Sequence, residues 1–130
     1  MKIYDENNNL LAVFIKKDGI KDGRSFETSN DEEFQIGAFN LEKDTVIENH
    51  IHLNQNRTIT KTSEALVVIN GEMEVTIYDN KKKFIEKILV QEGDTIALLS
   101  GGHGIKINSK CKFVEIKQGP YIEEEDKVRF

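Results

Sequence analysis

Apolar and polar residues alternate with a period of two along most of this chain, and this feature most constrains its fold. NLLAVFIK (9–16) and EALVVI (64–69) are short apolar runs that also read as strands, and the clearest alternation of the three is in EMEVTIYD (72–79). In the last run, Met73, Val75 and Ile77 share one face, because successive side chains of a strand point to opposite sides. The pattern indicates half-buried strands rather than helices. Only the acidic stretch at 122–128 suggests a short helix, and a frayed turn fits it equally well.

The strands that this alternation predicts are short and regularly spaced. They are 9–16, 34–42, 45–53, 64–69, 72–79, 84–90, 94–100, 104–108 and 112–117. Asn70-Gly71 stands between two of them and predicts a hairpin turn. Such a series is typical of an all-β sandwich or barrel. The chain has one proline, no linker rich in Gly, Pro or Ser, and no internal repeat, so we expect residues 1–130 to form a single domain.

Charge and composition exclude several classes of partner. The net charge is -5 and no basic stripe is present, so neither nucleic acid nor a membrane surface is an expected partner. No apolar run approaches the roughly 20 residues of a membrane span. The start of the chain turns polar too early for a secretory signal. The single cysteine, Cys111, fits a reducing compartment, and we expect a cytoplasmic protein.

The three histidines of the chain stand in two places. If 45–53 is a strand, His50 and His52 lie side by side on one face, as two ligands of one metal ion would. Two exposed histidines on an edge strand would look the same in sequence. His103 follows the turn Ser-Gly-Gly, where either a metal ligand or a solvent-exposed ring is compatible with the pattern. Glu64 opens an apolar strand between the two places.

These residues resemble the two motifs of small single-domain cupins. His50 and His52 match the H-x-H pair, Glu64 and Gly71 match E-x6-G, and Gly93, Gly101 and His103 match the second motif. The resemblance covers about residues 35–118. It implies a cupin-type jelly-roll barrel, also called a double-stranded β-helix, with an N-terminal strand and a short C-terminal tail. It also implies one divalent metal ion bound by His50, His52, Glu64 and His103.

The chain departs from the motif between His52 and Glu64, where eleven residues intervene. This insertion is either a longer loop at the mouth of the barrel or a strand pair that leaves and re-enters the sheet. Three imidazoles and one carboxylate suit Mn, Fe, Co, Ni or Zn better than Mg or Ca. The alternative is a cupin that uses its histidines for substrate contact or acid–base work without metal.

Further candidate residues flank the motifs. Arg57 and Lys61, in the insertion, are predicted to bind substrate, or else are solvated cations. The end of the chain resembles small cupins and sugar 3,4-ketoisomerase-like proteins, which implies that Lys117 binds substrate and that Tyr121 is catalytic. Otherwise both belong to a tail that packs on the barrel. Glu64 and His103 are the other candidate catalytic residues, where they are not occupied by metal.

Two function classes follow. The first is a metal-dependent enzyme with a small-molecule pocket inside the barrel, acting on a sugar or nucleotide sugar as an isomerase or epimerase. A metal-dependent oxygenase is a variant with the same ligands. The second is a non-catalytic, metal-containing ligand-binding or sensor domain. We also expect a homodimer, in which the apolar strand 9–16 covers an exposed sheet edge.

Overall fold

The computed structural model describes residues 1–130 apart from the side chains of Glu124 and Glu125. The described residues form an all-β protein, as the alternation predicts. Its strands are β1 Lys2–Tyr4, β2 Leu10–Ile15, β3 Gly23–Phe26, β4 Gly37–Asn40, β5 Glu64–Asn70, β6 Glu72–Tyr78, β7 Phe84–Gln91, β8 Thr95–Leu98, β9 Gly102–Ile107 and β10 Lys112–Lys117. A 3-10 turn at Lys17–Gly19 and a short helix, α1 at Glu123–Asp126, complete the elements.

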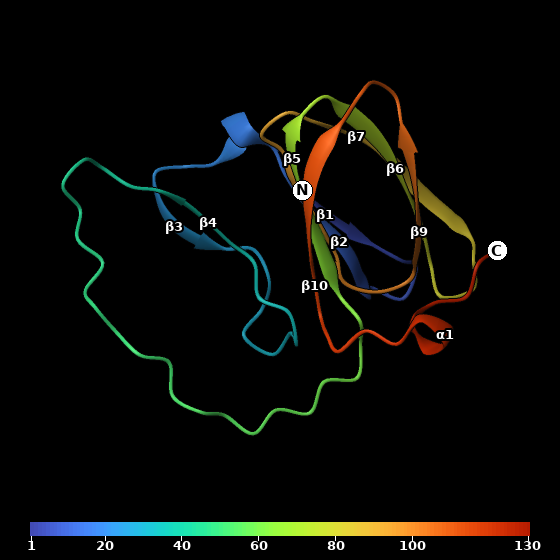
Figure 1. Ribbon diagram of the computed structural model, residues 1–130, viewed down its shortest axis with the longest axis horizontal. Helices are drawn as coiled ribbons and strands as arrows, with labels where there is room; N and C mark the ends of the chain where they lie inside the picture. Colours follow the sequence, from blue (N-terminus) through green and yellow to red (C-terminus); the bar gives the residue numbers. More distant parts are fainter.

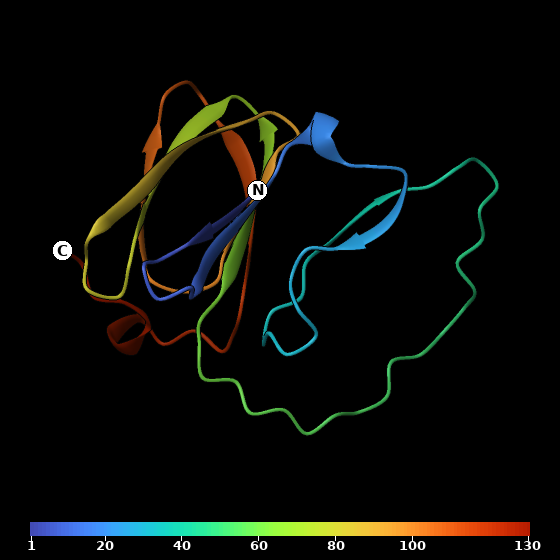
Figure 2. The same cartoon turned by 180° about the vertical axis from the view of Figure 1, so that it is seen from behind.

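The strands make three antiparallel sheets, which Figures 1 and 2 show from opposite sides. The five-stranded sheet has the order β1-β2-β8-β5-β10, and the three-stranded sheet has the order β7-β6-β9. β3 and β4 form a separate hairpin beside them. Among the described residues no sheet closes into a barrel, so β9 and β10 each keep one edge without a partner strand.

The main core lies between the five-stranded and three-stranded sheets. It combines Leu66 and Val68 of β5 with Met73, Val75 and Ile77 of β6, all essentially without solvent exposure. The inward face predicted for 72–79 is therefore confirmed. A second apolar cluster covers the other face of the five-stranded sheet, where side chains of the segment before β4 pack on it.

The prediction of a hairpin at Asn70-Gly71 is wrong, because β5 and β6 belong to different sheets. Gly71 has a φ of 89°, and a Cβ there would clash with the carbonyl oxygen of Lys110. Glycine at position 71 therefore allows the close turn by which the chain passes from one sheet to the other. The true hairpin joins β6 to β7, where the carboxylate of Asp79 accepts hydrogen bonds from the amides of Lys81 and Lys83.

The strand predicted at 45–53 is not formed. Residues 42–62 form neither strand nor helix and are largely exposed, and we call them the projecting loop. The loop extends away from the sheets (Figure 1). The insertion is therefore a loop. Val46, Ile51 and Leu53 are 78 %, 90 % and 80 % exposed. An alternating segment becomes a strand only where another strand accepts its hydrogen bonds, and this one has no such neighbour in its own chain. The strand predicted at 34–42 is shortened to β4.

The strand predicted at 9–16 is confirmed as β2, but it is not an edge. β2 pairs with β1 on one side and with β8 on the other, and its four central residues are buried. The prediction that this strand covers an exposed sheet edge in a dimer is therefore wrong, because both of its edges are already paired. No helix among the described residues has the length and apolar character needed to cross a membrane.

Candidate functional site

Glu64 and His103 form the closest contact between sequence-predicted site residues. Glu64 is the first residue of β5 and His103 lies near the start of β9, so the pair joins the two main sheets. Glu64 Oε1 is 2.8 Å from His103 Nε2, and the side chains are 14 % and 34 % exposed. The hydrogen bond from His103 lowers the pKa of Glu64, and the positive charges of Lys117 and Lys127 act in the same direction. Glu64 is therefore held as a carboxylate.

Lys117 lies next to this pair, because its register partner across β10 and β5 is Glu64. Its ammonium group is 3.1 Å from Asp126 Oδ2 and 4.4 Å from the centre of the Tyr121 ring. The hydrogen bond to Asp126 is the main cause that raises the pKa of Lys117. We call Glu64, His103, Lys117, Tyr121 and Asp126 the end cluster. It combines a carboxylate, an imidazole and a cation at one end of the two sheets.

The C-terminal tail lies across this end of the molecule. The ring of Phe130 meets the ring of Tyr78 edge-on at 5.2 Å, and the ammonium group of Lys82 lies 5.2 Å from its centre. A Cβ on Gly102 would come within 2.9 Å of the Phe130 ring, so a glycine beside His103 makes room for the tail. The tail thus packs on both sides of the Glu64–His103 pair, at Lys117 and at Gly102.

His50 and His52 lie apart from the end cluster, in the projecting loop. Their ring centres are 5.0 Å apart, and His50 Nδ1 is 2.8 Å from the carbonyl oxygen of Glu48. Among the described side chains, no three of His, Cys, Asp and Glu lie close enough together to hold a metal ion. The structure therefore arranges the four predicted metal ligands as two pairs, and the metal site remains a prediction.

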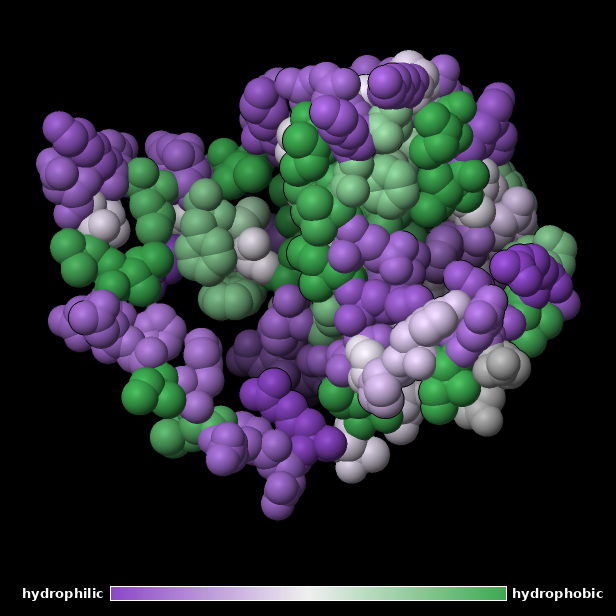
Figure 3. Space-filling view, viewed as in Figure 1, coloured by the Kyte–Doolittle hydropathy of each residue, from purple (hydrophilic) through white to green (hydrophobic). Residues whose placement is uncertain are grey.

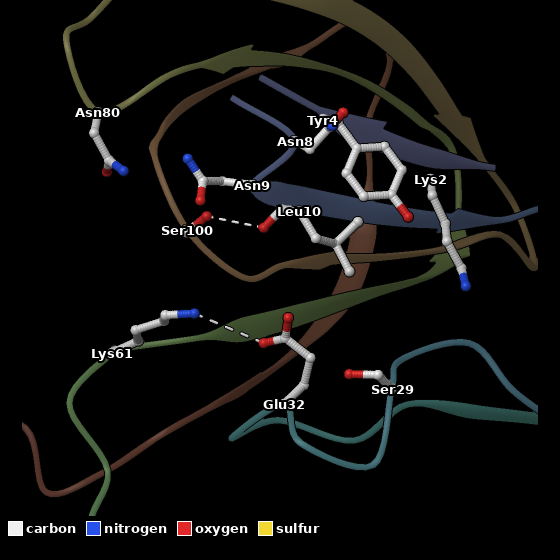
Figure 4. A pocket seen from close by; sticks show the side chains of 10 residues that line it. All are labelled: Lys2, Tyr4, Asn8, Asn9, Leu10, Ser29, Glu32, Lys61, Asn80 and Ser100. Carbon is white, nitrogen blue, oxygen red and sulfur yellow. Dashed lines mark hydrogen bonds and ion pairs between the residues drawn. The ribbon is translucent and has the colours of Figure 1, made fainter. Parts of the chain in front are cut away.

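The predicted substrate-binding residues are also separated. Arg57 is exposed in the projecting loop, whereas Lys61, at the base of that loop, lies 3.7 Å from Glu32. Lys61 lines a polar cavity of about 400 Å³ beside the β1–β2 turn (Figure 4). The other side chains that line it are Lys2, Tyr4, Asn8, Asn9, Leu10, Ser29, Glu32, Asn80 and Ser100. Neither Glu64 nor His103 belongs to this cavity.

Asp126 is the site residue that sequence reasoning missed. Its side chain is 9 % exposed and its carboxylate neutralises Lys117. The acidic run that contains it is plain in the sequence, but nothing in that run singles out one carboxylate. Only the fold of the tail selects it, since α1 ends there and turns this side chain toward β10.

A family model described as "Domain of unknown function (DUF6016)" matches residues 21–90, more than half of the chain. The matched range includes the projecting loop and the strands β3 to β7 except for the last residue of β7. No curated protein matches the chain, and no solved structure matches it.

Proposed function

Because the chain belongs to the DUF6016 family, whose description states no activity, we propose from its own side chains that it is a metal-binding cupin-type domain that acts on a small polar substrate. The observation that carries the proposal is the contact of 2.8 Å between Glu64 and His103. A carboxylate and an imidazole from two different sheets converge there beside a cation, at the end of an apolar core. Titratable side chains that converge in this way, with the pKa of Glu64 lowered by a specific partner, mark a candidate functional site.

The free edge of β9 supports a jelly-roll in which one strand remains to be added. β6 and β9 pair so that Val75 is opposite Ile105 and Met73 is opposite Ile107. Opposite residues of an antiparallel pair point to the same face. Val75 is buried, yet Ile105 and Ile107 are 39 % and 49 % exposed. The inward face of the sheet is therefore uncovered along β9, directly after His103.

We propose that the segment 45–53 fills this edge in the complete fold. It carries the alternation of a strand, and it would then place His50 and His52 on the same side as His103. The donor set fits a divalent transition metal, because it offers three imidazole nitrogens and one carboxylate that His103 keeps ionised. Such an ion, when bound, acts as a Lewis acid on a carbonyl or hydroxyl oxygen.

The chain's own residues would do the remaining work. Lys117 offers a cation beside Glu64, suited to an anionic or carbonyl oxygen of the substrate. Tyr121, whose ring lies against Lys117, supplies a hydroxyl that can hold or move a proton. These groups fit an isomerase or epimerase that acts on a sugar or nucleotide sugar. Arg57, in the projecting loop just after the segment 45–53, is the proposed second contact with the substrate.

A non-catalytic sensor or binding domain is the second candidate, and the tail favours it. Asp126 already pairs with the ammonium group of Lys117. The tail also packs beside the Glu64–His103 pair through Phe130, whose ring lies on Tyr78. A small anionic ligand would have to displace this carboxylate. Binding would then be coupled to release of the tail, which is a property of a sensor.

The test is to load the purified chain with Mn, Fe, Co, Ni and Zn in turn and to measure bound metal by elemental analysis. We expect about one ion per chain, lost in His50→Ala and in His52→Ala but retained in the control Arg57→Ala. No metal above background after reconstitution would contradict the proposal. Exchange of substrate protons with D₂O, followed by NMR on keto sugars, then separates the two candidates. Exchange supports the enzyme, whereas a ligand-induced rise in Tm without exchange supports the sensor.

A further inference from the structure

We infer that the partner of the free β9 edge is the segment 45–53 of a second copy, so that two chains exchange these segments. The assignment of His50 and His52 to the partner's site rests on the proposed function. The exchange itself rests on exposed area, on the anchoring of the projecting loop and on the uncovered face of β9.

The exposed area of the chain is too large for an isolated domain. A compact monomer of 14.9 kDa has an accessible surface of about 7,000 Å². This chain exposes 9730 Å². The excess is about 2,700 Å² per chain, and for two chains it falls in the range that obligate dimers bury. Figure 3 shows where part of it lies, in apolar side chains along the projecting loop and over the outer face near β10.

The base of the projecting loop is tied to its own chain. The carboxylate of Glu33 accepts hydrogen bonds from the amides of Thr60 and Lys61 and from the hydroxyl of Thr60. Glu32 contacts Lys61 in addition. On the other side of the loop, β4 is held in its hairpin with β3. These contacts fix both ends of the loop on one side of the sheets.

From this base the loop extends away from its own β9. Figures 1 and 2 show the loop and β9 at opposite sides of the sheets. In the structure the segment 45–53 lies away from its own β9 while the contacts of Glu33 at the base of the loop are intact. In this extended arrangement the segment is presented to the β9 edge of another copy. The structure therefore favours exchange over closure within one chain.

The acceptor edge, β9, carries exposed apolar side chains on its inward face. Ile105 and Ile107 of β9 are exposed on the inward face, although the β6 side chains opposite them are buried. On the donor, the alternation puts His50 and His52 on one side of the segment and Ile51 on the other. Docking with the histidines inward would pair with β9 and leave Ile47, Ile51 and Leu53 on the outer side, the side to which Lys106 of β9 also points. An exchanged strand also removes the unpaired edge, which otherwise invites aggregation.

A reciprocal exchange closes with two-fold symmetry, because each chain donates one segment and accepts one. Each metal site would then contain Glu64 and His103 of one chain and His50 and His52 of the other. The site is incomplete without the second copy.

The first experiment detects the exchange without metal. In a Cys111→Ser background, the double variant Ile51→Cys/Lys106→Cys is treated with a short bis-maleimide linker and run on a denaturing gel. We expect a covalent dimer, whereas each single-cysteine variant stays largely monomeric. A product linked within one chain, or no linked product at all, would overturn the exchange. Sedimentation at micromolar concentration should give the mass of two chains, and a monomer mass would overturn it as well.

The second experiment connects the exchange to the metal site by complementation. His50→Ala/His52→Ala chains and Glu64→Gln/His103→Ala chains each bind no metal alone. After joint refolding at equal amounts, half of the dimers are mixed, and each mixed dimer has one complete site. We expect about one quarter of the wild-type metal per chain. Cross-linked dimers without metal in the wild type would refute the proposed function only. Metal in the wild type without recovery in the mixture would refute the exchange only.

Discussion

Glu64 and His103 are 39 positions apart in the sequence, yet Glu64 Oε1 lies 2.8 Å from His103 Nε2. One side chain belongs to the five-stranded sheet and the other to the three-stranded sheet. The pair therefore ties together the two layers that enclose the core, in addition to its proposed role in metal binding.

This pair should make the stability of the metal-free chain depend on pH. The pKa of Glu64 is lowered below the ordinary value of 4.5 in the folded chain, so the ionised form favours folding. The stabilisation is complete above that ordinary value and is lost as the pH falls through the lower, folded value. We expect Glu64→Gln to cost about 1–2 kcal/mol at pH 7. Urea unfolding at pH 7 and below pH 4 measures the effect.

The loss on acidification should be smaller in Glu64→Gln than in the wild type, because the variant has no carboxyl group to protonate at this position. Glu74→Gln is a matched control, since Glu74 pairs with Lys87 at the surface of β6. An equal pH dependence for wild type and Glu64→Gln would contradict this reading of the pair.

Glu33 should control the base of the projecting loop. Its pKa is lowered mainly by the hydroxyl of Thr60, and the amides of Lys61 and Thr60 add to this effect. The ionised form makes these contacts, so they persist above the ordinary pKa of 4.5 and are lost as the pH falls through the lower value. We expect Glu33→Gln to speed amide hydrogen exchange at Thr60 and Lys61 at neutral pH. Unchanged amide exchange at Thr60 and Lys61 would show that Glu33 does not anchor the loop. Glu27→Gln is the control, because the carboxylate of Glu27 contacts Ser25 rather than the loop.

Gly71 should not tolerate a side chain. Its φ of 89° and the Lys110 carbonyl oxygen, which a Cβ would strike, both oppose alanine. We expect Gly71→Ala to lower the free energy of unfolding by about 1–3 kcal/mol. Gly19→Ala is the control, because its Cβ would meet only an ordinary contact at 3.6 Å and its φ is not positive. Denaturant midpoints that agree for both variants would rule out the proposed strain.

Asp126 should hold the tail on the end cluster. Its hydrogen bond is the main cause that raises the pKa of Lys117. In Asp126→Asn we therefore expect the pKa of Lys117 to fall toward the ordinary 10.5, and residues 127–130 to exchange their amide hydrogens faster. NMR titration of the lysine side chain measures the first effect. Glu115→Gln, whose carboxylate is 3.9 Å from Lys117 rather than 3.1 Å, should shift it less.

The sequence predicted most strands correctly, because short apolar runs, continuous or alternating, report which side chains face a core regardless of the partner strand. This is why 9–16, 64–69 and 72–79 appear as β2, β5 and β6. Alternation carries no information about pairing, however, and the pairing errors have this cause. Asn70-Gly71 has the composition of a hairpin turn, yet the strands around it pair with β8, β10, β7 and β9 instead of with each other.

The candidate site divides in the same way. Glu64 and His103 were singled out by their resemblance to the cupin motifs, and Lys117 by the resemblance of the chain end to sugar 3,4-ketoisomerase-like proteins. Only the tertiary structure decides that Asp126 is the carboxylate that pairs with Lys117, and where the projecting loop lies. The first depends on how the tail packs against β10, and the second depends on which strand edge is available. Residues 45–53 can form a strand only when a neighbouring strand pairs with their backbone groups, and the sequence of the segment does not say whether such a neighbour exists.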